Sequence, residues 1–563
     1  MSPKELFESF KGKPLAEVNT KIEGICGIVD FFDSEEYTLD LGETQANKVE
    51  YGDWQTNFEL AARVCLLVKE QGYAPNVAIE PTCGTGTFIL AAAIVFGDSL
   101  ELIYGIEIYK PYINQLKYRF VEYGLNNPGV ITCKIKLIHQ SIFGFDFDSL
   151  GIAKEKNVLL IGNPPWVTNS KLGEINSDNL PQKSNFKNVK GLEAITGKAN
   201  FDIAEYITYQ LLDAFNQRNS CLAFLIKSSV AKNVVYEQKN GKYNISRIVQ
   251  YNIDAKKEFD VSVAACLFVV HLGTGKAKQC EVKDFYNPVE TIRFGWVNEN
   301  FVSNVSYYSE SSDIDGKCQV AWWSGLKHDC SKVMELEYKD GILYNNLKEV
   351  VDIENDLVYP ILKSSDIKNE CVESSRKYVI VTQKSTSDDT SKIRVNQPKT
   401  YSYLTEHNTY FDKRGSVIYK KRPKFCIFGI GPYSFQKYKI AIAGLYKSTS
   451  FSLVMPINGK CTMLDDTCYL MGFDELEDAR CFMKVLNSDI VQKFMKSIVF
   501  HDAKRSINKD TLMRIDLLKA AQILLEKKSI TKDEHNTINS YISTHTSRKG
   551  KDALLFTNED FLS

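Results

Sequence analysis

The 563-residue sequence has no apolar stretch that approaches the length of a membrane-spanning helix. Its first residues, Met-Ser-Pro-Lys-Glu, contain no apolar signal core, so we expect a cytoplasmic protein with no membrane partner. Hydrophobic residues make up 44% and charged residues 25% of the chain, which is typical of globular proteins. A chain of this length exceeds a single ordinary core, and two or three domains are expected.

Patterns for metal binding and for disulfide frameworks are also absent. The 14 cysteines include no Cys-x-x-Cys pair, and the seven histidines form no His-x-x-x-His cluster. These absences argue against zinc ribbons and against a disulfide-stabilised fold. We therefore expect reduced, mostly buried thiols and no metal.

A strong excess of positive charge is missing as well, because the formal net charge is −1. This value does not favour nucleic-acid binding, but affinity for DNA depends on the local density of cations that face phosphates. Residues 411–447 supply such a density, with interleaved aromatic residues and a single acid, Asp412. Their cations are Lys413, Arg414, Lys420, Lys421, Arg422, Lys424, Lys437, Lys439 and Lys447. A second basic cluster surrounds Lys504 and Arg505. A solvated basic face is the alternative interpretation.

The most informative motif is Asn163-Pro164-Pro165-Trp166. It follows an apolar run, Val158–Ile161, that predicts a buried strand. Two consecutive prolines form a stiff turn after this strand, because each lacks a backbone N–H and has a fixed φ. In open α/β sheets the carboxyl ends of strands are where ligands bind. The Asn163 carboxamide and the Pro164 carbonyl are two rigid acceptors beside an aromatic ring, which suits an amino group on a flat ring. A Pro-rich turn without a function is the alternative.

A second motif, Glu80-Pro81-Thr82-Cys83-Gly84-Thr85-Gly86, lies between a short apolar strand and an Ala-rich helix. Gly84 and Gly86 permit a positive φ and close approach of the backbone to a ligand. No Gly-Lys-Ser/Thr follows, so the loop is not a Walker A motif, and it does not match the Gly-x-Gly-x-x-Gly of dinucleotide sites. An ordinary strand-to-helix turn requires neither Glu-Pro nor paired glycines.

The two motifs together resemble the DNA adenine-N6 branch of the methyltransferases that use S-adenosyl-L-methionine (SAM). That family has (Asn/Asp/Ser)-Pro-Pro-(Tyr/Phe/Trp) as its catalytic motif and (Asp/Glu)-Pro-x-Cys-Gly-x-Gly as its SAM loop. The resemblance implies catalytic roles for Asn163, Pro164, Pro165 and Trp166, and SAM contacts from Glu80, Pro81, Thr82, Cys83, Gly84 and Gly86. The SAM loop precedes the catalytic motif and a long C-terminal region follows, which is the γ order of the family.

Further cofactor contacts are implied by the same resemblance. Glu107 ends a second predicted strand about twenty residues beyond the glycine loop, where a carboxylate accepts hydrogen bonds from ribose hydroxyls, and Ile108 follows it. Thr56 is the predicted N-cap of an amphipathic helix. In the family, the start of a similar helix closes over the methionine end of SAM.

Two positions fit the family less closely. In a third predicted strand, residues 136–143, Ser141 stands where the family often has aspartate, and Ile142 follows it against the adenine of SAM. A hydroxyl can still bond an adenine amino group, but the residue type departs from the pattern. Phe259 matches the aromatic position that stacks on the far face of the target base, together with Trp166, although a single phenylalanine also suits a core.

We predict an α/β fold, with a doubly wound SAM-dependent methyltransferase sheet followed by a mixed, strand-rich target-recognition domain. The predicted parts are an N-terminal appendage at 1–50, a catalytic domain at 51–300, a polar linker at 301–339, and the target-recognition domain with a helical tail at 340–563. The insertion at 167–198 is either a loop that closes over DNA or a spacer. The predicted DNA contacts are Lys420, Lys421, Arg422, Lys424, Lys504 and Arg505.

The expected function is site-specific methylation of the N6 amino group of a flipped-out adenine in double-stranded DNA. Alternatives are methylation of RNA adenine or of a protein glutamine, a non-catalytic DNA-reading subunit, and a methylase component of a larger defence complex. A separate cognate restriction endonuclease is a possible partner. A fused nuclease is disfavoured, because no nuclease motif stands before residue 51.

Overall fold

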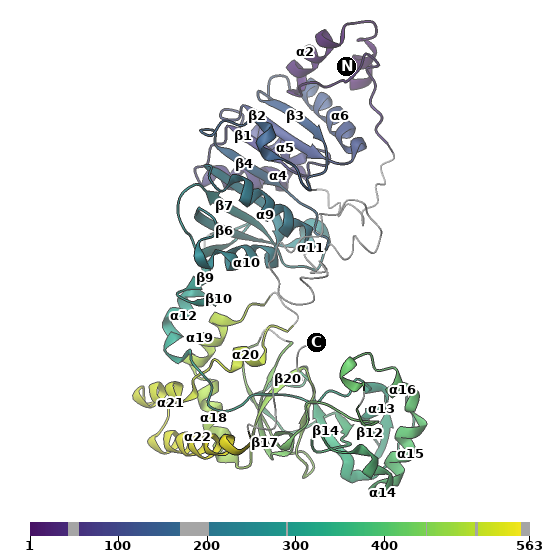
Figure 1. Cartoon of the computed structure of the whole chain (residues 1–563), viewed down its shortest axis with the longest axis vertical. Helices are drawn as coiled ribbons and strands as arrows, with labels where there is room; N and C mark the ends of the chain where they lie inside the picture. Colours follow the sequence, from purple (N-terminus) through teal and green to yellow (C-terminus); the bar gives the residue numbers. More distant parts are fainter. Residues whose placement is uncertain are drawn as a thin grey trace. The chain divides into compact units, whose positions relative to one another are not determined.

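The computed structural model divides into two compact units, residues 1–301 and 302–563 (Figure 1). The structure describes residues 1–42, 56–168, 202–288, 291–420, 422–445, 448–501 and 505–552, with side chains described through residue 545.

A ten-stranded sheet in the order β10-β9-β8-β6-β7-β5-β4-β1-β2-β3 forms the centre of the first unit. The five strands from β3 to β5 in this order are parallel, β7 is antiparallel to both of its neighbours, and β8 is parallel to β6 and antiparallel to β9. The strands are β1 (Val77–Glu80), β2 (Leu102–Glu107), β3 (Lys134–His139), β4 (Val158–Gly162), β5 (Ser220–Lys227), β6 (Ile245–Ile253), β7 (Ala265–Leu272), β8 (Gln279–Asp284), β9 (Ile292–Val297) and β10 (Asn300–Val302).

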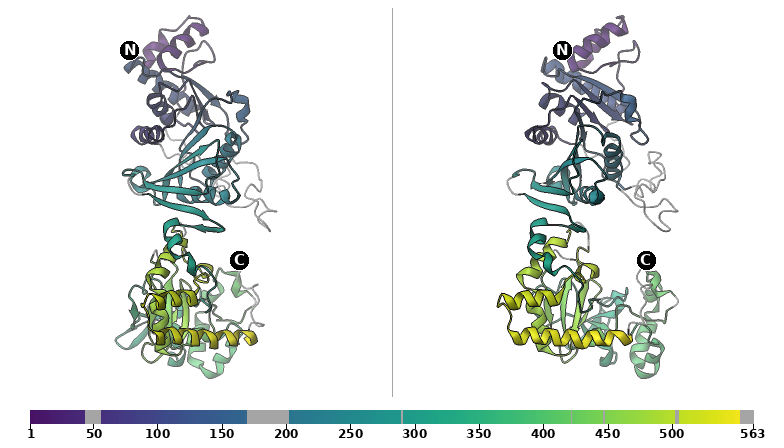
Figure 2. Two further views of the ribbon diagram at one scale, coloured as in Figure 1. Left: turned by 90° about the vertical axis from the view of Figure 1, so that its left-hand side faces the viewer. Right: turned by 60° about the vertical axis from the view of Figure 1, so that its left-hand side comes forward.

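Helices cover both faces of this sheet (Figure 2). They are α4 (Phe58–Glu70), α5 (Thr87–Val95), α6 (Lys110–Asn126), α9 (Ile203–Phe215), α10 (Ser228–Glu237) and α11 (Ala255–Phe259). Because both faces are covered, every residue of β1 and β4 is buried, and their sequences are nearly continuous apolar runs. The predicted doubly wound α/β fold is confirmed. Strand order reverses between β1 and β4, and ligands of open α/β sheets bind at such a switch point.

The first 42 residues belong to the first unit. They form α1 (Pro3–Glu8) and α2 (Leu15–Cys26), and α2 packs against α6. Ile28 forms a parallel bridge with Ile135 of β3, and Lys117 of α6 donates a hydrogen bond to the Phe31 carbonyl. This segment therefore covers the β3 edge of the sheet.

Two five-stranded sheets organise the second unit, in the orders β11-β20-β17-β18-β15 and β13-β12-β16-β14-β19. The strands are β11 (Trp323–Ser324), β12 (Glu335–Lys339), β13 (Ile342–Asn345), β14 (Val358–Leu362), β15 (Cys371–Val372), β16 (Lys377–Ile380), β17 (Tyr438–Ala443), β18 (Ser452–Val454), β19 (Met463–Leu464) and β20 (Cys468–Phe473). The strand-rich character predicted for this half is confirmed.

Short helices connect these strands, and longer ones follow them. They are α12 (Val305–Ser311), α13 (Ser331–Met334), α14 (Ile393–Asn396), α15 (Pro398–Glu406), α16 (Asn408–Asp412), α17 (Pro432–Phe435), α18 (Leu476–Leu486), α19 (Asp489–Ile498), α20 (Lys509–Leu512), α21 (Leu517–Glu526) and α22 (Lys532–Asp552). The 3₁₀ helices within the described parts of both units are η1 (Phe147–Leu150), η2 (Gln238–Asn240), η3 (Ser312–Ile314), η4 (Asn355–Leu357), η5 (Thr390–Lys392) and η6 (Val417–Tyr419). Among the helices that the structure describes, none is long and apolar enough to cross a bilayer.

The segment expected as a linker, residues 301–339, is folded. It contains α12, which packs along α19, and the buried side chains of Tyr308, Ile314 and Trp322. The Arg514 guanidinium also pairs with Asp315 at 2.6 Å. The polar, Ser-rich composition suggested a linker because the few apolar residues that anchor the segment are widely spaced.

Candidate active site

The glycine loop joins β1 to α5 at the carboxyl edge of the sheet. Its two glycines have different surroundings. Gly84 has a φ of 50°, and no heavy atom of the described residues beyond its chain neighbours lies within 4 Å of the position that a β-carbon would take. Gly86 has a φ of 80°, and the Leu116 side chain of α6 lies 2.5 Å from the corresponding position. Gly84 therefore leaves room for a ligand, whereas Gly86 is required by packing between helices.

The carboxylate of Glu107 ties this loop to the end of β2. Its Oε2 accepts a hydrogen bond from the Gly84 amide at 2.8 Å, and its Oε1 accepts one from the Tyr109 amide at 2.9 Å. These two backbone donors orient the carboxylate beside Gly84. The structure thus brings together the predicted ribose ligand and the glycine loop.

Glu80 and Thr82 each have a buried side-chain oxygen, Oε2 and Oγ1, with no hydrogen-bond partner among the described residues. Glu80 is only 3% exposed. Burial raises the pKa of its carboxyl well above the usual value, and the nearby Glu107 carboxylate adds to the rise. Native proteins rarely leave buried polar groups unsatisfied. Two such oxygens in the loop that carries Gly84 indicate a site for a polar ligand.

The Asn-Pro-Pro-Trp turn lies at the same edge of the sheet, because β4, which it follows, pairs in parallel with β1. Asn163 Nδ2 donates a hydrogen bond to Thr56 Oγ1 at 3.2 Å. Thr56 is not the N-cap of α4, so that prediction is wrong by one residue. Asn57 takes this place, and its side chain accepts a hydrogen bond from the Leu60 amide at 2.7 Å. The Thr56 hydroxyl contacts Asn163 instead.

Trp166 and Phe259 lie against each other. Their ring centroids are 5.0 Å apart with an interplanar angle of 68°, and the two residues are 7% and 6% exposed. The Trp166 indole N–H donates to the Leu225 carbonyl at 3.0 Å, which fixes the plane of its ring. The structure therefore brings the two predicted base-stacking residues together, but in edge-to-face contact with no space for a base between them.

A partly buried ion pair lies at the far end of this turn. Lys227 Nζ, at the end of β5, donates to the Trp166 carbonyl at 3.1 Å and to Asp202 Oδ2 at 2.5 Å. Asp202 also caps α9 by accepting from the Ala204 amide at 3.0 Å. Burial raises the pKa of Asp202, and the charge of Lys227 opposes that rise. The roles of Lys227 and Asp202 could not be predicted from the sequence, because no local pattern marks a pair of residues 25 positions apart.

The third predicted cofactor strand ends earlier than expected, since β3 stops at His139. Ser141 lies in the turn that follows, where its Oγ accepts a hydrogen bond from the Phe143 amide at 3.2 Å. Ile142 is buried, and its carbonyl accepts from the Gln210 side chain of α9 at 2.9 Å. Both residues follow a strand that is a parallel neighbour of β2, so they belong to the same sheet edge as Glu107.

A comparison with curated proteins decides the family. The chain is 38% identical over 487 residues to the type II methyltransferase M.NspV of Nostoc sp. (strain ATCC 29411 / PCC 7524). The match covers 86% of this chain and 100% of that protein. The chain belongs to the type II methyltransferases. The methyltransferase family indicated by the two motifs is therefore confirmed, although no protein-family profile matches the chain.

Solved structures similar to this methyltransferase include two restriction enzymes. The type IIL restriction-modification enzyme MmeI in complex with DNA is 11% identical with a TM-score of 0.49, over 100% of this chain and 80% of that chain. The type IIG restriction endonuclease BpuSI is 14% identical with a TM-score of 0.34, over 93% of this chain and 63% of that chain.

The predicted DNA-contacting cations of the methyltransferase lie in its second unit. Lys420, Arg422 and Lys424 are exposed, whereas Lys421 and Lys504 lie outside the described residues. The guanidinium of Arg422 stands 5.9 Å from the centroid of the Phe428 ring, and Lys424 Nζ stands 5.7 Å from that of Phe425.

Other cations of the basic segments are already engaged within the methyltransferase. Arg505 bonds both the carboxylate and the carbonyl of Asp466, each at 3.1 Å. Lys439 lies on β17 and is 1% exposed, and its Nζ donates to the Gln436 carbonyl at 2.7 Å. Burial lowers its pKa to about 8. The position of Lys439 in the basic segment suggested that it faces phosphates. Because it is buried, it does not contribute to such a surface.

Proposed function

We propose that this type II methyltransferase transfers a methyl group from SAM to the N6 amino group of an adenine in double-stranded DNA. The observation that carries the proposal is the meeting of three parts at one sheet edge. The glycine loop, the carboxylate of Glu107 and the Asn-Pro-Pro-Trp turn all lie where strand order reverses.

The residues at this edge fit SAM. Gly84 leaves open space, Glu107 is oriented beside it, and Glu80 and Thr82 offer the buried oxygens described above. In the proposal these residues hold the cofactor together with Thr56, Pro81, Cys83, Gly86, Ile108, Ser141 and Ile142. When bound, SAM supplies an electrophilic methyl group on a positively charged sulfur.

Asn163 and Pro164 act on the amino group of the base. Each N–H of an adenine amino group needs an acceptor, and the Asn163 carboxamide and the Pro164 carbonyl provide one each. The bond to Thr56 fixes the carboxamide with Oδ1 as its acceptor end. Two hydrogen bonds draw the nitrogen lone pair out of conjugation with the ring, so that it becomes the nucleophile. Pro165 keeps the turn stiff, which makes the effect one of orientation and electrostatics without a general base.

A target adenine must leave the DNA stack before it reaches this turn, at a cost of a few kcal/mol. Stacking on Trp166 and Phe259 offsets this by about 1–3 kcal/mol per base. Because the Trp166 ring is fixed by its bond to Leu225, we assign the movement that admits the base to Phe259. Phe259 is the last residue of α11, a helix of only five residues.

Replacing Asn163 with Ala tests this function. Transfer of tritium-labelled methyl from SAM to duplex DNA should fall by at least about 10²-fold, which corresponds to roughly 2.7 kcal/mol. SAM affinity, measured by calorimetry, should stay within about threefold, because Asn163 acts on the base. Mass spectrometry of the digested wild-type product should show N6-methyladenine.

Two results would contradict the proposal. Near-normal turnover of the Asn163→Ala variant would remove this residue from catalysis. Methylation of an RNA of the same sequence, without methylation of duplex DNA, would show that the substrate is RNA and that the assignment of duplex DNA is wrong. If instead the proposal holds, long-read mapping of methylated adenine in cells that carry the gene should give the recognised sequence.

A further inference from the structure

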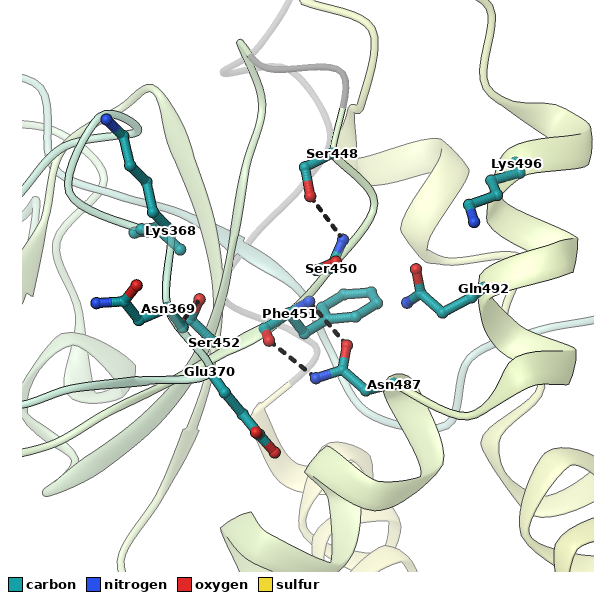
Figure 3. Close-up of a pocket in the computed structure, with 11 residues that line it drawn as sticks. Lys368, Asn369, Glu370, Ser448, Ser450, Phe451, Ser452, Asn487, Gln492 and Lys496 are labelled. Atoms are coloured by element: carbon teal, nitrogen blue, oxygen red, sulfur yellow. Dashed lines mark hydrogen bonds between the residues drawn. The ribbon is translucent and has the colours of Figure 1, made fainter.

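The second unit contains a groove of about 790 Å³ that none of the predicted sites includes (Figure 3). One wall is the segment 367–370, which precedes β15, and another is the segment 448–452, which ends at the first residue of β18. Asn487, between α18 and α19, and Gln492 and Lys496 of α19 complete the lining. Nine of these eleven lining residues are polar or charged, and they carry hydroxyl, carboxamide, ammonium and carboxylate groups.

Two carboxamides hold the central wall in place. The Asn487 side chain accepts a hydrogen bond from the Phe451 amide and donates one to the Phe451 carbonyl, both at 2.9 Å. Gln492 donates to the Thr449 carbonyl at 3.1 Å and accepts from the Thr449 hydroxyl at 2.8 Å. The wall is thus rigid before any ligand binds, which lowers the entropic cost of binding.

Exposed and buried residues alternate over residues 448–451 of this wall. Thr449 and Phe451 are buried, whereas Ser448 and Ser450 are exposed. This alternation is the period-2 pattern of extended backbone. Two serine hydroxyls consequently line the groove on a backbone that the carboxamides fix.

Two lysines stand on opposite sides of this wall in Figure 3, Lys368 on one side and Lys496 on the other. Both are exposed, and neither forms an ion pair with any residue that the structure describes. Lys493, one turn earlier on α19, differs because it pairs with Glu310 and Asp489. Glu370 is the single acid among the described residues that line the groove, and in Figure 3 its carboxylate points away from both lysines.

We propose that this groove is a phosphate-contact surface for the backbone of duplex DNA, with Lys368 and Lys496 as the cations and Ser448 and Ser450 as hydroxyl donors. The inference rests on the proposed function and assigns the surface of the second unit that binds the DNA backbone. Unpaired lysines and hydroxyls are the groups that proteins use to bind DNA phosphates. A site for a small organic ligand is instead mostly apolar. A volume of about 790 Å³ also exceeds what a single phosphate group fills.

The test compares the double variant Lys368→Ala/Lys496→Ala with wild type in binding to a fluorescent duplex of mixed sequence over a range of salt concentrations. Each lost phosphate contact lowers the slope of log affinity against log salt by about 0.9. We expect the slope to fall by about two units and the affinity at low salt to fall at least tenfold, equally for different sequences. The variant Lys368→Arg/Lys496→Arg should restore the slope, because the charges return.

Lys399→Ala/Lys484→Ala is the matched control. These two lysines lie in the same unit, have exposed side chains, and pair with Asp352 and Glu534. The control has the same change in net charge, and its slope should stay near that of wild type. Equal slopes for the two alanine double variants would overturn the groove assignment.

The outcomes distinguish a failure of the groove assignment from a failure of the proposed function. If wild type methylates duplex DNA but the groove variant keeps its slope, only the groove assignment fails. If wild type neither binds nor methylates duplex DNA, the proposed function fails and the groove assignment fails with it. If inorganic phosphate alone stabilises wild type against heat but not the groove variant, while the DNA slope is unchanged, the groove holds a small anion and the DNA assignment is wrong.

Discussion

Two carboxylates, Glu80 and Glu107, end neighbouring parallel strands and have opposite surroundings. Glu107 accepts hydrogen bonds from two backbone amides, which stabilise its charged form. Glu80 is 3% exposed, and one of its oxygens has no partner among the described residues. Its charged form is therefore costly in the folded protein. Such a cost is expected at a binding site, where stability and function oppose each other.

Replacing Glu80 with Gln should stabilise the protein at neutral pH. The folded-state pKa of Glu80 is raised above its ordinary value of 4.5, so the folded state binds more protons than the unfolded state at pH values between the two. Stability from this group is complete below pH 4.5 and is lost as pH rises through the folded pKa, by up to about 1.4 kcal/mol per pH unit. Gln does not ionise, so the Glu80→Gln variant does not lose this stability as the pH rises. Melting temperatures at pH 5 and pH 8 should show the gain at pH 8 alone.

The same variant should bind SAM more weakly, which calorimetry measures, because a neutral amide replaces a carboxyl at the cofactor edge. Glu101→Gln is the control, since Glu101 forms an exposed ion pair with Lys156 in the same unit. A Glu80→Gln variant that gains no stability at pH 8 relative to this control would show that Glu80 is not strained by burial.

At the scale of elements, local patterns predicted the parts whose boundaries are set by local sequence. The apolar run before Asn163 became β4, and the runs near residues 221–226 and 263–270 became β5 and β7. Strong turn residues and continuous apolar runs define such strands without long-range information. The helix that follows Thr56 was also predicted, and only its cap was misplaced.

Elements that depend on distant partners could not be predicted in this way. Lys439 belongs to a run of cations in sequence, yet it lies on a strand with both neighbours in place and is buried. Residues 301–339 look like a linker until α19 supplies a partner for α12. The candidate site likewise has features that local sequence predicts and features that depend on distant residues. Its motifs were visible in the sequence, whereas the Trp166–Phe259 contact and the Lys227–Asp202 pair require the folded sheet.

The Lys227–Asp202 pair joins β5, α9 and the turn after β4, and its removal should loosen all three. Lys227→Met leaves the buried Asp202 carboxylate without its cation, at a cost of about 3 kcal/mol in the free energy of unfolding. The double variant Lys227→Met/Asp202→Asn removes both charges and should recover more than half of that loss. Urea unfolding of wild type, Lys227→Met, Asp202→Asn and the double variant measures the difference. A double variant that is as unstable as the two single losses added together would show that the groups are not energetically coupled.

At the scale of the whole molecule, the chain forms two compact units, residues 1–301 and 302–563. Two apolar clusters consist of residues of the second unit, such as Leu336, Val379 and Phe425 in one and Ala441 and Leu470 in the other. All the proposed SAM ligands lie in the first unit, whereas the proposed phosphate contacts lie in the second. Substitutions should therefore be able to weaken cofactor binding without weakening DNA binding, and DNA binding without weakening cofactor binding.

Hydrogen exchange with and without SAM tests this separation. A ligand at 100 times its dissociation constant stabilises the state that binds it by about 2.7 kcal/mol. Amides of β1, β2 and β4 should then exchange more slowly, because they open only when the first unit unfolds, while those of β12, β16 and β17 should not change. Glu107→Ala should abolish the protection, and the groove variant Lys368→Ala/Lys496→Ala should keep it. Equal slowing in the strands of both units would mean that the two units unfold cooperatively. Cofactor binding and DNA binding could then not be assigned to separate units.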